Sequence, residues 1–226
     1  MTTATTRIAL IHATRLAIDP VEEAAKRLWP EAEMVSLLDE SLEVDRERAG
    51  SLTPALADRI MALARHAQSF GTCGILFTCS AFGEAVEAAD AALNIPVMKP
   101  NEAMFADALL HGDKIAMIYT FPPAAAGMEA EFRALVSARG ASATIESHLC
   151  DGALTAKQAG DAETHDRLIA ECGALLKDYD AILLAQFSMA SAAACLSQRT
   201  EASVLTSPQS AILEMRRRVE SGTRSC

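Results

Sequence analysis

The stretch GILFTCSAFGEAVEAADAAL, residues 74–93, carries the clearest structural signal in the chain. Gly74 to Phe77 is continuously apolar, which is typical of a strand covered on both faces of a parallel sheet. The Ala-rich run from Ser80 onward predicts a helix, so Cys79 lies at a strand-to-helix turn. The free N–H groups and positive end of such a helix favour a thiolate, which can remove a proton or attack carbon. The alternative is a buried cysteine that packs as a small apolar side chain.

The composition excludes several classes of protein. Half of the 226 residues are apolar but only 4% are aromatic, and the formal net charge is −10. Such a balance disfavours binding to nucleic acid or to an anionic membrane surface. No run approaches the roughly 18 consecutive apolar residues of a membrane span, and the first residues lead straight into a strand-like IALIHA without a cleavage site. We therefore expect a soluble, cytoplasmic protein.

The six cysteines, at positions 73, 79, 150, 172, 195 and 226, are widely spaced. They form neither a CxxC pair nor a Cys/His cluster, so we expect reduced thiols and no metal site. Cys73 is expected in the core, and Cys172, Cys195 and Cys226 in packing or solvent positions. The chain contains neither GxGxxG nor GxxxxGK[ST], and we predict no cofactor.

Short aliphatic runs alternate with helical stretches from end to end. The pattern predicts strands at residues 7–13, 33–38, 74–78, 96–98, 114–119, 143–149, 181–185 and 203–206. It predicts helices at 20–28, 54–69, 80–93, 101–111, 124–138, 162–177, 189–197 and 208–219. This alternation of strands and helices indicates an α/β architecture with parallel sheets flanked by helices.

The second half of the chain resembles the first. The first half contains, in order, GILFTCSAF, a predicted helix and IPVMKPNEAM. The second half contains, in the same order, AILLAQFSM, a predicted helix and ASVLTSPQSAI. We therefore expect two pseudo-symmetric α/β lobes, residues 1–112 with Cys79 and residues 113–226 with Gln186, the C-terminal helix being able to cross to the other lobe. Because open α/β sheets bind ligands at the carboxyl ends of their strands, we expect the active-site cleft between the lobes, with Cys79 opposite Gln186.

Three segments together resemble the aspartate/glutamate racemase superfamily, which also contains hydantoin racemases, maleate isomerases and arylmalonate decarboxylases. They are LFTCSAFG at 76–83, PVMKPNEAM at 96–104 and LLAQFSMA at 183–190. In each lobe of these proteins a central strand ends in a cysteine followed by a small hydroxyl residue. Cys79 and Ser80 fit the first position, whereas Gln186 and Phe187 depart from the second. The resemblance also implies a homodimer.

The departure at Gln186 limits the chemistry. Racemisation needs a base on one face of the α-carbon and an acid on the other, and an amide can be neither. The resemblance implies a cofactor-independent isomerase or racemase-like enzyme that acts on a small carboxylate or hydantoin-like amide through Cys79. A single-cysteine decarboxylase or other lyase and a cis–trans isomerase remain alternatives within the superfamily. A small-molecule-binding protein without catalysis and a Cys-His hydrolase are alternatives from other classes.

Several polar residues near strand ends are candidates for substrate binding. Substrate oxygens that gain negative charge need fixed donors, and suitably placed side chains follow four of the predicted strands. These candidates are Thr78, Ser80, Gln186, Ser188, Thr120, Thr14 and His12. His148 is a candidate for the missing second acid or base. Asp39, Glu40 and Ser41 are expected to form an acidic turn without a chemical role.

Overall fold

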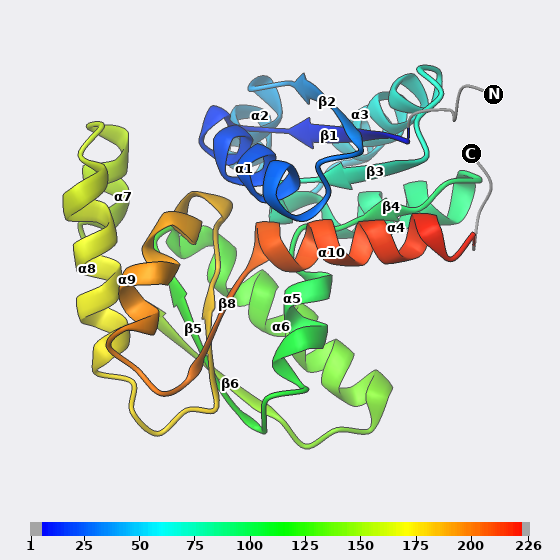
Figure 1. Cartoon of the computed structure of the whole chain (residues 1–226). Coiled ribbons are helices and arrows are strands. Elements are labelled where there is room, and N and C mark those ends of the chain that lie inside the picture. The colour runs from blue at the N-terminus through cyan, green and yellow to red at the C-terminus, as the bar shows by residue number, and fades with distance from the viewer. Residues whose placement is uncertain (1–5, 223–226) are drawn as a thin grey trace. The chain divides into compact units, whose positions relative to one another are not determined.

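The computed structural model describes residues 6–222, which form two compact units (Figure 1). Unit 1 consists of residues 6–100 and 211–222, and unit 2 of residues 101–210. The expected boundary near residue 112 differs from this division because residues 102–108 pack into the core of unit 2. No helix among residues 6–222 is both long enough and apolar enough to cross a membrane.

Unit 1 is built on a four-stranded parallel sheet of order β2-β1-β3-β4. Its strands are β1 (Arg7–His12), β2 (Glu33–Leu38), β3 (Gly74–Phe77) and β4 (Val97–Met98). Its helices are η1 (Arg15–Ala17), α1 (Ile18–Leu28), α2 (Ser41–Ala49), α3 (Pro54–Gln68), η2 (Ser80–Phe82), α4 (Gly83–Ala92) and most of α10 (Ser207–Glu220). Parallel strands joined by helices confirm the predicted α/β class for this half of the chain.

The central strand β3 is buried along its whole length, as its apolar run predicts. Ile75 and Phe77 pack with residues of α3 and α4 in one apolar cluster. Gly74 permits a close approach of α10, because a Cβ at this position would lie 2.5 Å from Sδ of Met215. Arg216 fixes the same helix by donating to the carbonyl of Leu28 at 2.9 Å. The C-terminal helix is therefore part of the core of unit 1.

Unit 2 repeats the topology with a four-stranded parallel sheet of order β6-β5-β7-β8. Its strands are β5 (Lys114–Tyr119), β6 (Thr144–Leu149), β7 (Ala181–Leu184) and β8 (Ser203–Thr206). Its helices are α5 (Glu102–Ala108), α6 (Pro122–Arg139), α7 (Ala153–Gln158), α8 (Ala162–Ala174), η3 (Phe187–Ala192) and α9 (Ala193–Ser197). The repeat expected from the sequence is thus present in the strand order of both sheets.

Helices cover both faces of the unit 2 sheet (Figure 1). On one face α5 and α6 pack through Phe105 and Phe132, whose ring centroids lie 5.6 Å apart in an edge-on arrangement. On the other face α8 and α9 pack on β5 and β7 through a second apolar cluster. Burial on both faces explains why β7 reads as an uninterrupted apolar run.

All eight predicted strands are present, but among the described residues the α-helices α2 and α7 and the short 3-10 helix η1 were not predicted. Helix α2 has the sequence SLEVDRERA, in which only Leu42 is buried, so it lacks the apolar period that marks a packed helix. Helix α7 is only six residues long. Hydrophobic periodicity identifies neither kind of element.

Candidate functional site

Cys79 and Gln186 occupy equivalent positions in the two units. Each lies two residues beyond the end of its strand, β3 or β7, and each immediately precedes a 3-10 helix. The backbone is extended at both, with φ −119° and ψ 127° at Cys79 and φ −105° and ψ 147° at Gln186. The repeat expected from the sequence therefore extends to the local conformation at these two positions.

The thiol of Cys79 is partly buried and accepts a hydrogen bond from the backbone N–H of Ala81. Burial raises the pKa of Cys79 to about 11, although the Ala81 N–H acts to lower it. Among charged neighbours, Glu43 raises this pKa and Arg46 lowers it. Cys79 is therefore a protonated thiol at neutral pH.

The expectation of a resting thiolate at Cys79 is wrong for a structural reason. Helix α4 begins at Gly83, and the short η2 lies between it and Cys79. The favourable potential of a helix N-terminus falls off beyond the first turn, so α4 contributes little at this distance. The loss of hydration on burial then decides the protonation state.

Glu43 and Arg46 of helix α2 lie near Cys79 and are not among the site residues predicted from the sequence. Arg46 donates from Nε to the carbonyl of Ala81 at 3.2 Å and so contacts the turn that follows Cys79. Glu43 lies one helical turn before Arg46 on the same helix. In the sequence these residues belong to the charged run that follows β2. Such a run is typical of a solvated helix and does not indicate which residues the helix contacts.

The start of α2 is held by ion pairs to α3. Arg59 donates to Asp39 at 2.8 Å and to Asp45 at 3.0 Å, and it also contacts Ser41. Burial alone would raise the pKa of Asp39, but the hydrogen bonds from Arg59 and Ser41 hold it below its ordinary value. The acidic turn at residues 39–41 thus anchors the start of α2.

His12 is fully buried at the end of β1, within unit 1. Its Nδ1 lies 3.0 Å from Oγ1 of Thr78, and its Nε2 lies 3.2 Å from Oγ of Ser36. Ser36 donates in turn to Glu22 at 3.1 Å. Burial lowers the pKa of His12 to about 4, so the ring is neutral at neutral pH.

Both ring nitrogens of His12 lie beside hydroxyl groups. The Ser36 hydroxyl proton is given to Glu22, so Ser36 can accept from Nε2 of His12. The hydroxyl of Thr78, the residue before Cys79, is within reach of Nδ1 of His12 and lies 3.4 Å from the carbonyl oxygen of Ile11. Both ring nitrogens of His12 therefore have partners inside unit 1.

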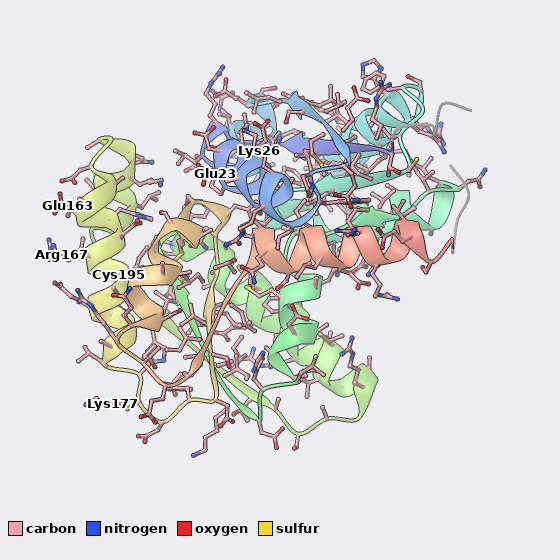
Figure 2. All side chains as sticks on the ribbon, viewed as in Figure 1. Glu23, Lys26, Glu163, Arg167, Lys177 and Cys195 are labelled. Atoms are coloured by element: carbon pink, nitrogen blue, oxygen red, sulfur yellow. The ribbon has the colours of Figure 1, made fainter. Side chains whose placement is uncertain are left out.

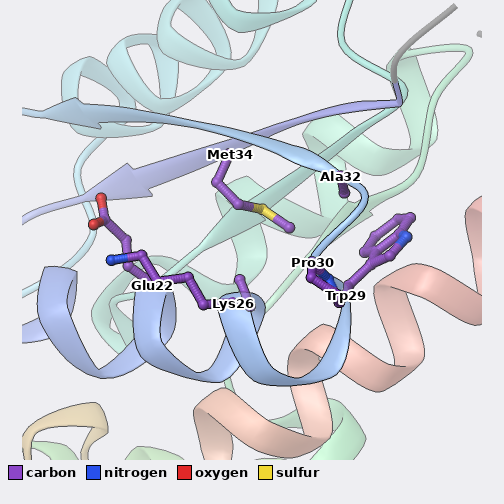
Figure 3. Close-up of a pocket in the computed structure, with 7 residues that line it drawn as sticks. Glu22, Lys26, Trp29, Pro30, Ala32 and Met34 are labelled. Atoms are coloured by element: carbon purple, nitrogen blue, oxygen red, sulfur yellow. The ribbon is translucent and has the colours of Figure 1, made fainter.

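Glu22, at the far end of this chain of hydrogen bonds, lines a hollow between α1 and β2. The hollow has a volume of about 300 Å³ and is lined by Glu22, Ala25, Lys26, Trp29, Pro30, Ala32 and Met34. Figure 3 shows Glu22 and Lys26 on α1 and the side chain of Met34 reaching toward this helix from β2. Cys79 is not among its lining residues, so this hollow is separate from the thiol.

In unit 2 the structure brings together Gln186 and Thr120, two of the candidates for substrate binding. Oε1 of Gln186 accepts from the Thr120 N–H at 2.9 Å and lies 3.2 Å from the Thr120 hydroxyl. Nε2 of Gln186 is buried and has no hydrogen-bond partner among the described residues. Ser188 is also buried, two residues further along η3. Because Thr120 holds the carbonyl end of the amide, the amide N–H groups of Gln186 remain available as donors.

His148, the predicted second acid or base, points to other partners. Its Nε2 lies 3.3 Å from the Tyr179 hydroxyl, which donates to Glu146 at 2.6 Å. The hydrogen bond to Glu146 raises the pKa of Tyr179 to about 12. None of these contacts belongs to the turn at Gln186, so the structure gives no support for His148 as a second acid at that turn.

The other predicted candidates lie at the strand ends of unit 1. Thr14 is half-buried and precedes η1, and Ser80 is the first residue of η2. Within the described part of the chain, His, Cys, Asp and Glu side chains form no cluster able to hold a metal ion.

The structure describes Cys73 but not Cys226. Cys73 is disulfide-bonded, so the expectation of a reduced thiol is wrong there. The spacing of the cysteines in the sequence gave no sign of such a bond. Cys226, expected in a packing or solvent position, lies outside the described residues.

The chain matches the model of one known protein family. The model of the family described as Asp/Glu/Hydantoin racemase matches residues 11–216. Comparison with curated proteins finds no match. Among solved structures, allantoin racemase from Pseudomonas fluorescens superposes with a TM-score of 0.72 at 16% identity, over 98% of this chain and 94% of that one.

Two further solved structures share the fold. Glutamate racemase isoform RacE1 from Bacillus anthracis has a TM-score of 0.69 at 16% identity, over 96% of this chain and 82% of that one. Unliganded arylmalonate decarboxylase has a TM-score of 0.65 at 16% identity, over 96% of this chain and 94% of that one. At this level of identity the three structures establish the fold alone.

Proposed function

Because the chain belongs to the Asp/Glu/Hydantoin racemase family, we propose that it is a cofactor-independent, isomerase-type enzyme that transfers a proton at the α-carbon of a small carboxylate or hydantoin-like substrate through Cys79. The observation that carries this proposal is the thiol at the carboxyl end of β3, beside the backbone N–H of Ala81. Parallel α/β sheets bind ligands at this end of their strands.

We propose that hydrogen-bond donors at the strand-end turns bind the substrate oxygens. When a proton leaves the α-carbon, negative charge develops on these oxygens and must be stabilised by fixed donors. Ser80, Ser188 and Nε2 of Gln186 are donors of this kind, and Thr14 is a candidate contact for a carboxylate. Thr120 orients Gln186 by occupying its Oε1. Thr78 positions the Cys79 turn through His12.

Only one of the two equivalent turns can move a proton. The amide of Gln186 neither gives up nor takes a proton near neutral pH, so it cannot act as a partner to Cys79 in the way a second thiol would. We therefore propose a one-thiol reaction, in which Cys79 acts on one face of the α-carbon. Proton exchange at the α-carbon then occurs without inversion.

A second candidate reaction is decarboxylation, and the raised pKa of Cys79 favours it. The bond between the α-carbon and a carboxylate breaks, carbon dioxide leaves, and the electron pair passes into an enediolate. The S–H of Cys79 then donates its proton to the α-carbon, and the thiolate recovers a proton from water. This reaction starts from the protonated thiol, which is the resting form.

The pH dependence of the rate distinguishes the two candidates. With a pKa near 11, about one Cys79 thiol in ten thousand is ionised at pH 7. If Cys79 first acts as a base, the rate rises about tenfold per pH unit up to that pKa. If Cys79 acts first as an acid, the rate is independent of pH in the same range and falls above it.

The proposal is tested by incubating small carboxylic acids, malonates and hydantoins with the protein in heavy water and following the α-proton by NMR. We expect deuterium at the α-carbon without inversion, or decarboxylation of a malonate. Cys79→Ser should reduce the rate by about 10²- to 10⁴-fold, the usual contribution of a positioned acid or base. Cys195→Ser, on α9, is the matched control and should keep the full rate.

A gain-of-function variant makes the test sharper. Gln186→Cys places a thiol at the position equivalent to Cys79, and we expect it to convert exchange with retention into racemisation. Failure of every candidate substrate to exchange or to lose carbon dioxide would argue for a binding protein without catalysis. An unchanged rate in Cys79→Ser would refute the assigned role of the thiol.

A further inference from the structure

The hollow between α1 and β2 has a charged end and an apolar wall. Its volume of about 300 Å³ is at the lower end of the range for small-molecule sites. Glu22 and Lys26 supply the charges, and Trp29 and Met34 belong to the apolar wall. We propose that this hollow binds a free amino acid with a large apolar side chain. The inference does not depend on the proposed reaction of Cys79, which does not line the hollow.

Glu22 and Lys26 present opposite charges at one end of the hollow. They are four positions apart on α1, so they share one face of the helix. In Figure 3 their charged ends point to the same side, away from the ring of Trp29. Within residues 6–222 neither side chain belongs to an ion pair, either with the other or with a third residue. A carboxylate and an ammonium group that share a face without being paired can together bind a zwitterion.

A hydrogen bond fixes the carboxylate of Glu22. Its Oε1 accepts from the Ser36 hydroxyl at 3.1 Å, and Oγ of Ser36 lies 3.2 Å from Nε2 of the buried His12. Among the described residues Oε2 of Glu22 has no hydrogen-bond partner, so it is available to accept from an ammonium group. A side chain that is already fixed before the ligand arrives loses less conformational entropy on binding.

The apolar wall of the hollow is preformed. Trp29 follows the last residue of α1, is 3% exposed, and donates from its backbone N–H to the carbonyl of Ala25 at 2.8 Å. Arg216 of α10 donates to the carbonyl of Leu28 at 2.9 Å and so fixes the end of the same helix. Met34 of β2 is half-buried, and its flexible thioether side chain can fit an apolar group of varied shape. An apolar ligand side chain placed against this wall would be removed from water, which favours binding.

The charges and the apolar wall together define the class of ligand. An uncharged apolar molecule would leave both Glu22 and Lys26 without a partner. A simple anion would be repelled by Glu22, and a simple cation by Lys26. An amino acid pairs its ammonium group with Glu22 and its carboxylate with Lys26, and its side chain covers the apolar wall. It is therefore complementary to the hollow in charge and in polarity.

The test is a titration of the full-length protein with three probes of similar shape. They are L-phenylalanine, phenethylamine, which lacks the carboxylate, and 3-phenylpropanoate, which lacks the ammonium group. Binding is followed by calorimetry and by the fluorescence of Trp29, the one tryptophan of the chain. We expect phenylalanine to change the emission of Trp29 and to bind about tenfold more tightly than either analogue, because each analogue lacks one charge-assisted hydrogen bond. Cys79→Ser should give the same affinities, which separates this site from the proposed active site.

Two variants assign the charged contacts. Glu22→Gln should remove the advantage of phenylalanine over 3-phenylpropanoate, and Lys26→Gln should remove its advantage over phenethylamine. Glu23→Gln is the matched control and should bind all three probes as the wild type does, because Glu23 follows Glu22 on α1 but does not line the hollow. Figure 2 labels Glu23 and Lys26 on this helix.

The comparison of the three probes on the wild-type protein does not depend on the folding of any variant. Absence of phenylalanine binding, equal affinities for the three probes, or binding without a change in Trp29 emission would overturn the proposal. Equal weakening of phenylalanine binding by Glu22→Gln and Glu23→Gln would also overturn it.

Discussion

Replacement of His12 by glutamine should remove a pH-dependent part of the stability of unit 1. Burial holds the pKa of His12 at about 4 in the folded protein, against 6.5 for an ordinary histidine. Between these values the unfolded chain binds a proton that the folded chain does not. The contribution of His12 is therefore complete above about pH 6.5 and is lost progressively as the pH falls toward 4.

The size of the effect follows from the shift in the pKa. A difference of about 2.5 pH units, at about 1.4 kcal/mol per unit, corresponds to roughly 3 kcal/mol in the free energy of unfolding. This contribution is large compared with the roughly 5–15 kcal/mol by which domains are stable. The glutamine side chain of the variant does not titrate, so the difference in stability between wild type and variant should shrink by this amount from pH 7 to pH 4.

The assay is urea unfolding at a series of pH values, followed by the fluorescence of Trp29. Trp29 is the one tryptophan of the chain and is 3% exposed in unit 1, the unit that contains His12. His66→Gln is the matched control, because His66 lies on α3 of the same unit but is exposed. A stability difference for His12→Gln that stays constant with pH, or that changes equally for His66→Gln, would refute the reasoning.

Two further substitutions test packing and electrostatics. Gly173→Ala would place a Cβ 2.5 Å from Leu196 Cδ1, so overpacking should lower the stability of unit 2 by about 1–3 kcal/mol, seen as a lower melting temperature by calorimetry. An unchanged melting temperature would mean that Leu196 moves aside freely. Arg46→Gln removes a charge that lowers the pKa of Cys79, so alkylation of Cys79 by iodoacetamide should slow at neutral pH. Arg48→Gln, on the exposed face of α2, should leave the rate unchanged, and equal slowing by both would contradict a local effect of Arg46.

The strands and the two strand-end turns could be predicted from the sequence because they depend on local patterns. The apolar runs that form β3 and β7 are each followed by a turn residue and a helical segment, and the same order appears twice. The positions of Cys79 and Gln186 follow directly from this repeat. The family resemblance rested on the same segments, and the family match extends over residues 11–216.

The environment of the thiol could not be predicted, because it depends on contacts between residues far apart in sequence. His12 meets Ser36 and Thr78 across separations of 24 and 66 positions, and a polar pattern within one strand does not reveal such partners. The protonation state of Cys79 follows from burial, which is a property of the assembled unit. Local sequence indicated a helix start near Cys79 but not the intervening η2 that separates the thiol from α4.

The contribution of α10 to the core of unit 1 has a consequence for biosynthesis. Residues 6–100 leave the ribosome long before residues 211–222, and the whole of unit 2 is made in between. Domains generally fold as units in the order in which they are synthesised, and here the continuous segment 101–210 can complete its fold first. The core of unit 1 around Gly74 is therefore complete only after Met215 has been synthesised and has packed against it. The part of unit 1 that precedes unit 2 in the sequence thus completes its core only after unit 2 has been made.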